Sequence, residues 1–186
     1  MCGGQGTRLD FDGEKPCFEI GGVPMIDRVI DALVASRIEQ VFAVVSPDTP
    51  RTAAHVDVPV IEGPGEGYVA DLERALDRVD TPVLTVGADL PLLAGEAVDW
   101  VLDEYDAGSA MVAVPVELKR SLGVSIDATI EAAGQEVAPT GVNVVGPPEP
   151  EQTLMTTDTR FAVNVNRLRD AWVATVLDDR RDDGPR

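Results

Sequence analysis

The chain has 186 residues, of which 44% are hydrophobic and 26% are charged, and its net charge is −18. This length suits one domain with a sizeable core, and no apolar run reaches the roughly 20 residues that a membrane span needs. The acidic excess argues against nucleic-acid binding, because the phosphate backbone demands a basic surface.

The acidic residues are spread along the chain, whereas lysine occurs only as Lys15 and Lys119. The apolar content and its periodicity are too high for a disordered chain. We interpret the charge as a solvated acidic surface suited to the cytosol of a halophile, where salt screens self-repulsion. The glycine-rich, polar start does not resemble a signal peptide, so we expect a cytoplasmic protein.

Hydrophobic periodicity predicts helices and strands that alternate along the chain. Helices are expected at residues 23–36, 67–79, 95–105 and 167–178. Strands are expected at residues 40–45, 58–61, 83–87, 110–116, 141–146 and 161–165. Residues 117–140 give no clear pattern beyond short strands. The alternation predicts an α/β fold, with a mainly parallel sheet and helices on both faces, in one domain of residues 1–178 before a charged flexible tail of residues 179–186.

The start of the chain is unusual for this class, because a glycine-rich loop comes before any strand. In a doubly wound sheet such a loop follows the first strand, which is central. We therefore expect a further strand upstream of Cys2.

The first candidate site is this loop, Gly3-Gly4-Gln5-Gly6-Thr7-Arg8, followed by Glu14-Lys15-Pro16. Glycines let backbone N–H groups approach phosphate oxygens, while arginine and lysine add positive charge. The pattern is neither a Walker A loop nor GxGxxG. The combination predicts a site for a triphosphate.

A second candidate is Asp89, in Gly87-Ala88-Asp89-Leu90-Pro91-Leu92, just beyond a buried strand. Ligands of α/β sheets bind at that end of the strands, and Mg²⁺ prefers one or two carboxylates together with phosphate oxygens. Asp89 is therefore a candidate Mg²⁺ ligand, although an aspartate capping the next helix would give the same pattern.

Two of the later predicted strands carry asparagines at their ends, in Gly141-Val142-Asn143 and in Asn164-Val165-Asn166. These side chains could complete a metal or ribose site, or they could simply form turns.

Two loops after strands, 46–50 and 63–68, are expected on the same face and could read a base and a ribose. Taken alone, each also fits an ordinary Pro/Gly turn.

The glycine-rich loop with Glu14-Lys15-Pro16 resembles the signature of nucleotidyltransferases with a Rossmann-like fold of the nucleotide-diphospho-sugar transferase type. Residues 87–92 and 161–166 are similar to later motifs of the branch that includes molybdenum cofactor guanylyltransferases. Three further segments resemble the archaeal guanylyltransferases that act on adenosylcobinamide phosphate: residues 46–52, 65–72 and 139–145.

The resemblance implies transfer of GMP from GTP to adenosylcobinamide phosphate, with release of pyrophosphate, in cobalamin biosynthesis. It implies catalytic roles for Arg8, Lys15 and Asp89, with Mg²⁺ held by Asp89 and Asn164. The implied nucleotide-binding residues are Gly3, Gly4, Gly6, Thr7, Arg8, Lys15, Ser46, Asp48, Thr49, Gly65, Gly67, Asp71 and Asp89. The implied acceptor-side residues are Gly141, Asn143 and Asn164.

Three alternatives stay open at this point. The acceptor could instead be molybdopterin, phospholactate or a sugar phosphate. The chain could also be a non-catalytic GTP-binding module, or a purely structural interaction domain.

Overall fold

The computed structural model describes residues 1–2, 9 and 11–182. Its main sheet has the strand order β5-β8-β6-β9, and β7 also pairs with β8. The strands are β5 (Val83–Val86), β6 (Ser109–Pro115), β7 (Ile130–Ala132), β8 (Gln135–Val145) and β9 (Glu151–Met155). The pairing is mixed, because β8 is antiparallel to β5, β6 and β7, whereas β9 is parallel to β6.

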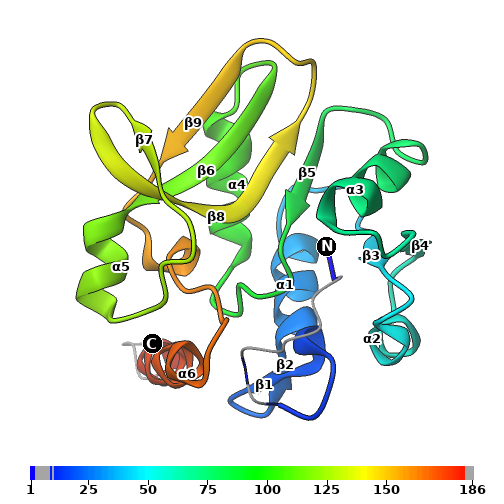
Figure 1. Cartoon of the computed structure of the whole chain (residues 1–186), viewed down its shortest axis with the longest axis horizontal. Coiled ribbons are helices and arrows are strands. Elements are labelled where there is room, and N and C mark those ends of the chain that lie inside the picture. The colour runs from blue at the N-terminus through cyan, green and yellow to red at the C-terminus, as the bar shows by residue number, and fades with distance from the viewer. Residues whose placement is uncertain (3–8, 10, 183–186) are drawn as a thin grey trace.

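A smaller parallel sheet joins β3 (Ala43–Val45) to β4 (Val60–Glu62), and β1 (Glu19–Ile20) forms a hairpin with β2 (Val23–Pro24). In Figure 1 the β3–β4 sheet and its helices lie on one side of β5, and the rest of the main sheet lies on the other. The α/β class is thus confirmed, with a mixed main sheet.

Helices cover these sheets through apolar faces. The α1 (Met25–Val34) and α4 (Gly95–Glu104) helices bury Val29, Val98 and Val101 against the valines of β6 and β8. Ala75 of α3 (Tyr68–Leu76) packs on β3 and β4. The α2 helix (Pro50–His55) packs on β3 together with the start of α1. The β3–β4 sheet therefore has helices on both faces.

Met1 and Cys2 lie between β3 and β5 and form backbone hydrogen bonds with both strands. The Cys2 backbone N–H donates to the Val44 carbonyl at 2.8 Å, and the Met1 amino group donates to the Val86 carbonyl at 2.9 Å. An apolar cavity of about 100 Å³ continues from them between the two strands. The expected upstream strand stays a prediction.

The segment without a clear pattern, 117–140, folds into α5 (Val116–Leu122), β7 and the first half of β8. The expected strand at 141–146 is the second half of β8. Gly141 and Asn143 consequently lie inside a strand of 11 residues rather than at a strand end.

The strand expected at 161–165 is wrong. The short 3-10 helix η2 (Thr159–Phe161) begins this segment, and the following residues form a loop. Val163 and Val165 are fully buried, so the alternating pattern is real, but they pack against α6 rather than beside a strand. Side-chain alternation reports a buried face and does not require a hydrogen-bonded neighbour.

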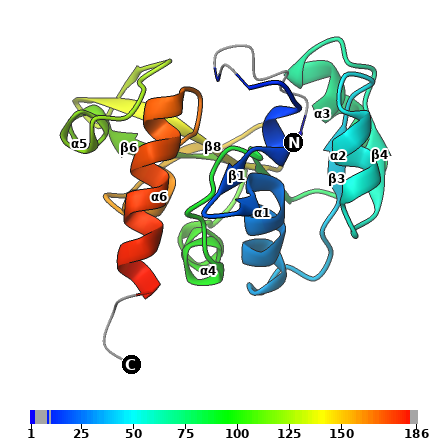
Figure 2. The same ribbon diagram turned by 90° about the horizontal axis from the view of Figure 1, so that it is seen from below.

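The last helix, α6 (Leu168–Asp182), runs four residues beyond the end expected from the sequence. The α1 and α4 helices contact each other, and Figure 2 shows them side by side. Among the described residues, no helix is long and apolar enough to cross a bilayer.

Candidate active site

A cavity of about 480 Å³ opens at the end of β5, between β8 and the loop that follows η2. It brings together six of the residues expected from the sequence: Lys15, Asp71, Asp89, Gly141, Asn143 and Asn164. Further polar lining comes from Tyr68 and Asn166, which belong to candidate segments, and from three residues that were not among the candidates: Lys119, Ser125 and Asp127.

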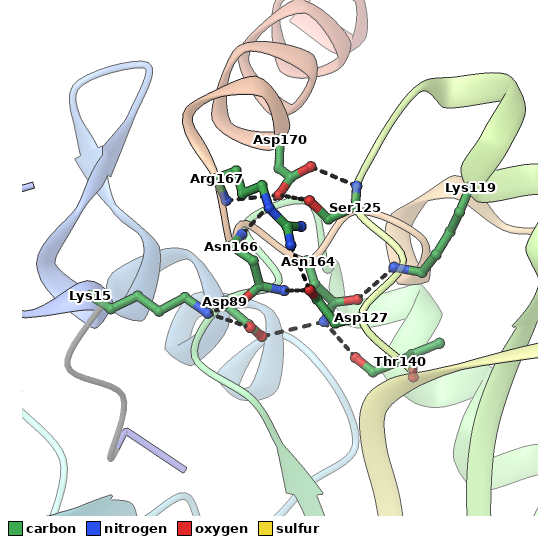
Figure 3. A network of polar contacts seen from close by, with 10 residues as sticks. All are labelled: Lys15, Asp89, Lys119, Ser125, Asp127, Thr140, Asn164, Asn166, Arg167 and Asp170. Atoms are coloured by element: carbon green, nitrogen blue, oxygen red, sulfur yellow. Dashed lines mark hydrogen bonds and ion pairs between the residues drawn. The ribbon is translucent and has the colours of Figure 1, made fainter. Parts of the chain in front are cut away.

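Lys15 and Asp89 form an ion pair in this cavity (Figure 3). The Lys15 Nζ lies 2.7 Å from the Asp89 Oδ2 and donates a second hydrogen bond to the Asn166 Oδ1 at 2.6 Å. The side chains of Lys15 and Asp89 retain 16% and 22% of their exposure. Both charges are therefore within reach of a ligand in the cavity.

Lys15 is held in place by its preceding neighbour. Glu14 accepts hydrogen bonds from the backbone N–H groups of Arg51 and Thr52 at 2.8 and 2.6 Å, and from the Thr52 hydroxyl at 2.7 Å. Burial alone would raise the pKa of Glu14, but the hydrogen bonds from Thr52 and Arg51 outweigh it and lower the pKa. Glu14 thus ties the turn that carries Lys15 to the first turn of α2.

Asp89 is positioned by the backbone on both of its sides. The Gly87 N–H donates to the Gly141 carbonyl at 2.9 Å, and the Val165 N–H donates to the Asp89 carbonyl at 2.9 Å. These bonds join the end of β5 to β8 and to the 162–166 loop. These backbone hydrogen bonds therefore fix the turn that carries the Asp89 carboxylate.

Asn164 links Asp89 to the second lysine. Its Nδ2 donates to the Thr140 carbonyl at 2.7 Å and lies 3.4 Å from the Asp89 Oδ1. Its Oδ1 accepts from the Lys119 Nζ at 3.0 Å. Asn164 therefore lies beside the candidate metal ligand, but its oxygen faces Lys119.

A second layer of polar contacts fixes the asparagine loop from behind. Asp170 is fully buried and accepts hydrogen bonds from the backbone N–H groups of Asn166 and Arg167 and from both donors of Ser125. The Asn166 Nδ2 donates to the Asp127 Oδ2 at 2.8 Å. This layer connects α6, the 123–128 segment and the Lys15 contact.

The strand-end loops expected to contact the base and ribose lie next to each other. In the first, the Ser46 N–H donates to the Thr49 Oγ1 at 3.0 Å, and the buried Ser46 Oγ has no hydrogen-bond partner among the described residues. In the second, the Gly65 N–H donates to the Asp71 Oδ1 at 2.9 Å. A Cβ on Gly65 would lie only 3.6 Å from the Ser46 Cβ, so the two loops touch.

The remaining candidates divide into two groups. Asp48, Gly65 and Gly67 are exposed, and with Ser46 and Thr49 they are not among the cavity-lining residues. The other candidates lie outside the described residues: Gly3, Gly4, Gly6, Thr7 and Arg8.

The residues that sequence reasoning missed come mainly from the segment that gave no clear pattern. Lys119, Ser125 and Asp127 all belong to it. The one available signal was composition, since Lys119 is one of only two lysines in a strongly acidic chain.

The fold and this site are those of enzymes that transfer nucleotides. The family model described as the MobA-like NTP transferase domain matches residues 1–126, and the chain belongs to this family.

Two relatives cover different shares of the chain. An adenosylcobinamide-phosphate guanylyltransferase from Methanocaldococcus jannaschii is 27% identical over 95% of this chain and 94% of its own length. A probable molybdenum cofactor guanylyltransferase from Natronomonas pharaonis is 31% identical over 63% of this chain and 60% of its own length.

Solved structures show the same fold. A hypothetical transferase from Thermus thermophilus matches with a TM-score of 0.67 at 18% identity, over 86% of this chain and 90% of that one. A CMP:2-keto-3-deoxy-manno-octonic acid synthetase complexed with CTP matches with a TM-score of 0.54 at 15% identity, over 71% and 67%.

Proposed function

We propose that this protein transfers GMP from GTP to adenosylcobinamide phosphate and releases pyrophosphate. The observation that carries the proposal is the cavity at the end of β5, where Lys15 and Asp89 form a partly exposed ion pair. The end-to-end match to the Methanocaldococcus jannaschii guanylyltransferase supports the choice of acceptor, since it extends past residue 126 through β8 and α6.

The chemistry follows from the charges. An oxygen of the acceptor phosphate attacks the α-phosphorus of GTP, and the bond from that phosphorus to the β-phosphate oxygen breaks. Pyrophosphate leaves with the electron pair. The attacking phosphate is already ionised at neutral pH, so positioning and charge neutralisation supply the catalysis.

Lys15 is suited to neutralise charge on the α-phosphate and on the departing pyrophosphate. A lysine ammonium is a mobile point charge, and Lys15 can turn from Asp89 and Asn166 toward a phosphate oxygen. We expect Arg8 and the glycine-rich loop to hold the other phosphates.

Asp89 is the residue suited to hold Mg²⁺. Within the described ranges no three His, Cys, Asp or Glu side chains gather as a metal site, so phosphate oxygens and water would complete the coordination. Bound Mg²⁺ would supply further neutralisation of phosphate charge. Asn164 would contribute its oxygen only after its bond to Lys119 opens or its amide turns.

The acceptor is tested by a panel. Purified protein with Mg²⁺ and GTP is incubated with adenosylcobinamide phosphate, molybdopterin, phospholactate or a sugar phosphate, and the products are analysed by mass spectrometry. We expect a GMP adduct with adenosylcobinamide phosphate. An adduct with another acceptor alone would overturn the acceptor and leave the transferase chemistry in place.

Molybdopterin is the second candidate acceptor. The match to the Natronomonas pharaonis relative favours it, but that match covers only 63% of this chain.

A further inference from the structure

Lys119 is a second cation in the cavity, and the chemistry described above does not use it. It projects from α5 into the lining of the cavity, yet it is only 3% exposed. Its ammonium donates a hydrogen bond to the Asn164 Oδ1 at 3.0 Å. Burial lowers the pKa of Lys119, while the carboxylates of Asp170, Asp89 and Asp127 oppose that shift.

This ammonium has spare hydrogen-bonding capacity. It carries three donors, and in the described part of the chain its one hydrogen bond goes to Asn164. A buried charge with unused donors is costly unless a ligand completes its contacts. Pro139 and Gly141 of β8 line the same cavity, and Gly141 has no side chain that would fill its space.

Lys15 and Lys119 approach the neighbouring side chains of Asp89 and Asn164 from opposite sides (Figure 3). Lys15 contacts the Asp89 Oδ2, whereas Lys119 reaches Asp89 through Asn164. An in-line displacement needs its nucleophile on the side of the α-phosphorus opposite to the leaving pyrophosphate. With Lys15 on the nucleotide side, Lys119 lies where the attacking anion would enter.

We propose that Lys119 binds the phosphate of the acceptor and holds it for attack on the nucleotide. This inference rests on the proposed function and adds the acceptor-phosphate subsite to it. Lys119 then offsets the repulsion between two polyanions that must approach each other in a strongly acidic protein.

The test compares two corrinoids that differ only in the acceptor phosphate. Binding of adenosylcobinamide phosphate and of adenosylcobinamide is measured by calorimetry in molar KCl, with Mg²⁺ and guanosine 5′-(α,β-methylene)triphosphate, which cannot react. The proteins are the wild type, Lys119→Met and Arg120→Met. Arg120 is a matched control, because it is a neighbouring cation on α5 with a side chain that is 53% exposed.

In the wild type and in Arg120→Met we expect the phosphate to strengthen binding by roughly ten- to a hundredfold, the range of a hydrogen bond between charged groups. In Lys119→Met we expect that gain to disappear, while adenosylcobinamide binds as in the wild type. A gain retained in Lys119→Met would overturn the proposal. Equal weakening of both corrinoids or of the nucleotide analogue would show that Lys119 only positions Asn164, and would overturn it too.

Failure of the proposed function gives a different result. If the wild type binds neither corrinoid, adenosylcobinamide phosphate is not the acceptor. Inorganic phosphate then serves as the probe, with ³¹P NMR titration in the presence of the analogue. Phosphate binding that is lost in Lys119→Met alone would support the subsite, and binding that is unchanged in that variant, or absent from the wild type, would overturn it.

Discussion

The Lys15–Asp89 pair at 2.7 Å sets the conditions for ligand entry. A phosphate group would compete with Asp89 for Lys15, and a metal ion would compete with Lys15 for Asp89. Binding of both ligands therefore replaces the Lys15–Asp89 ion pair with a Lys15–phosphate pair and an Asp89–metal pair. Each residue keeps its charge neutralised before and after the exchange.

We expect Lys15→Ala to lower kcat by about 10³–10⁵-fold, by analogy with the loss of a catalytic arginine finger. The physical reason is the loss of the cation at the reacting phosphate. Pyrophosphate release under saturating substrates measures it, and Lys15→Arg separates charge from shape. A Lys15→Ala enzyme within a few-fold of the wild type would remove Lys15 from the mechanism.

Glu14 stabilises the fold through its charged form. Its pKa is lowered in the folded state, so its contribution is present above the ordinary pKa of 4.5 and is lost as the pH falls through the lower folded value. We expect Glu14→Gln to lower the free energy of unfolding near neutral pH by about 1–3 kcal/mol, because charged acceptors make the stronger hydrogen bonds.

Urea unfolding at neutral pH and below pH 4.5 checks this expectation about Glu14. The difference between wild type and variant should shrink at the acidic pH. Glu19 is exposed, so Glu19→Gln is the control that removes one negative charge from the acidic chain. A difference that is the same at both pH values would rule out the charge-dependent contribution.

Among the elements, β5 and its following turn were the most predictable part of the site. The buried run of residues 83–87 identified the strand, and the general rule for α/β sheets placed Asp89 at its carboxyl end. Lys119 could not be placed in the same way, because it reaches the cavity only through α5 and the pairing of β7 and β8. The β7–β8 hairpin joins nearby residues, but the pairing of β8 with β5 and β6 joins distant ones and leaves no periodic signal in the 117–140 segment.

The loop of residues 162–166 shows the opposite case. Its alternating pattern correctly separated the buried Val163 and Val165 from the polar Asn164 and Asn166. The strand expected there was wrong, because the Val165 backbone N–H donates to the Asp89 carbonyl rather than to a neighbouring strand. The sequence pattern therefore predicted which side chains of this segment are buried, but it did not predict which element the segment bonds to.

At the β4–α3 connection, the absence of a side chain on Gly63 leaves room for the carboxylate of Asp71. A Cβ on Gly63 would lie 2.2 Å from the Asp71 Oδ1, closer than any real contact. We expect Gly63→Ala to displace that carboxylate and to weaken GTP binding by about tenfold or more, the loss expected for a charged hydrogen bond.

A double-mutant cycle tests this relation between Gly63 and Asp71. GTP binding of Gly63→Ala, Asp71→Ala and the double variant is measured by calorimetry. The double variant should bind no more weakly than Asp71→Ala, because the clashing carboxylate is gone. Additive losses would contradict the link.

For the molecule as a whole, the net charge of −18 is spread over the chain and must repel itself in the compact state. Salt screens that repulsion over about 10 Å at 0.1 M and about 3 Å at 1 M. We expect the melting temperature to rise between low and molar KCl. Sorbitol at equal osmolality is the control, and a melting temperature that fails to rise with KCl would refute the expectation.

The arrangement around β3 and β5 is also a property of the whole molecule. The sequence predicted both strands and the covering helices α1 and α3, but it did not predict α2. It could not predict how Met1 and Cys2 bond across both strands, because these contacts join residues more than forty positions apart.

The most direct test of the central claim is pyrophosphate release in molar KCl with Mg²⁺ and GTP, with and without adenosylcobinamide phosphate. We predict release only when both GTP and the corrinoid are present, and its loss when Mg²⁺ is chelated. GTP binding without pyrophosphate release in the presence of the corrinoid would contradict the proposed guanylyltransferase activity.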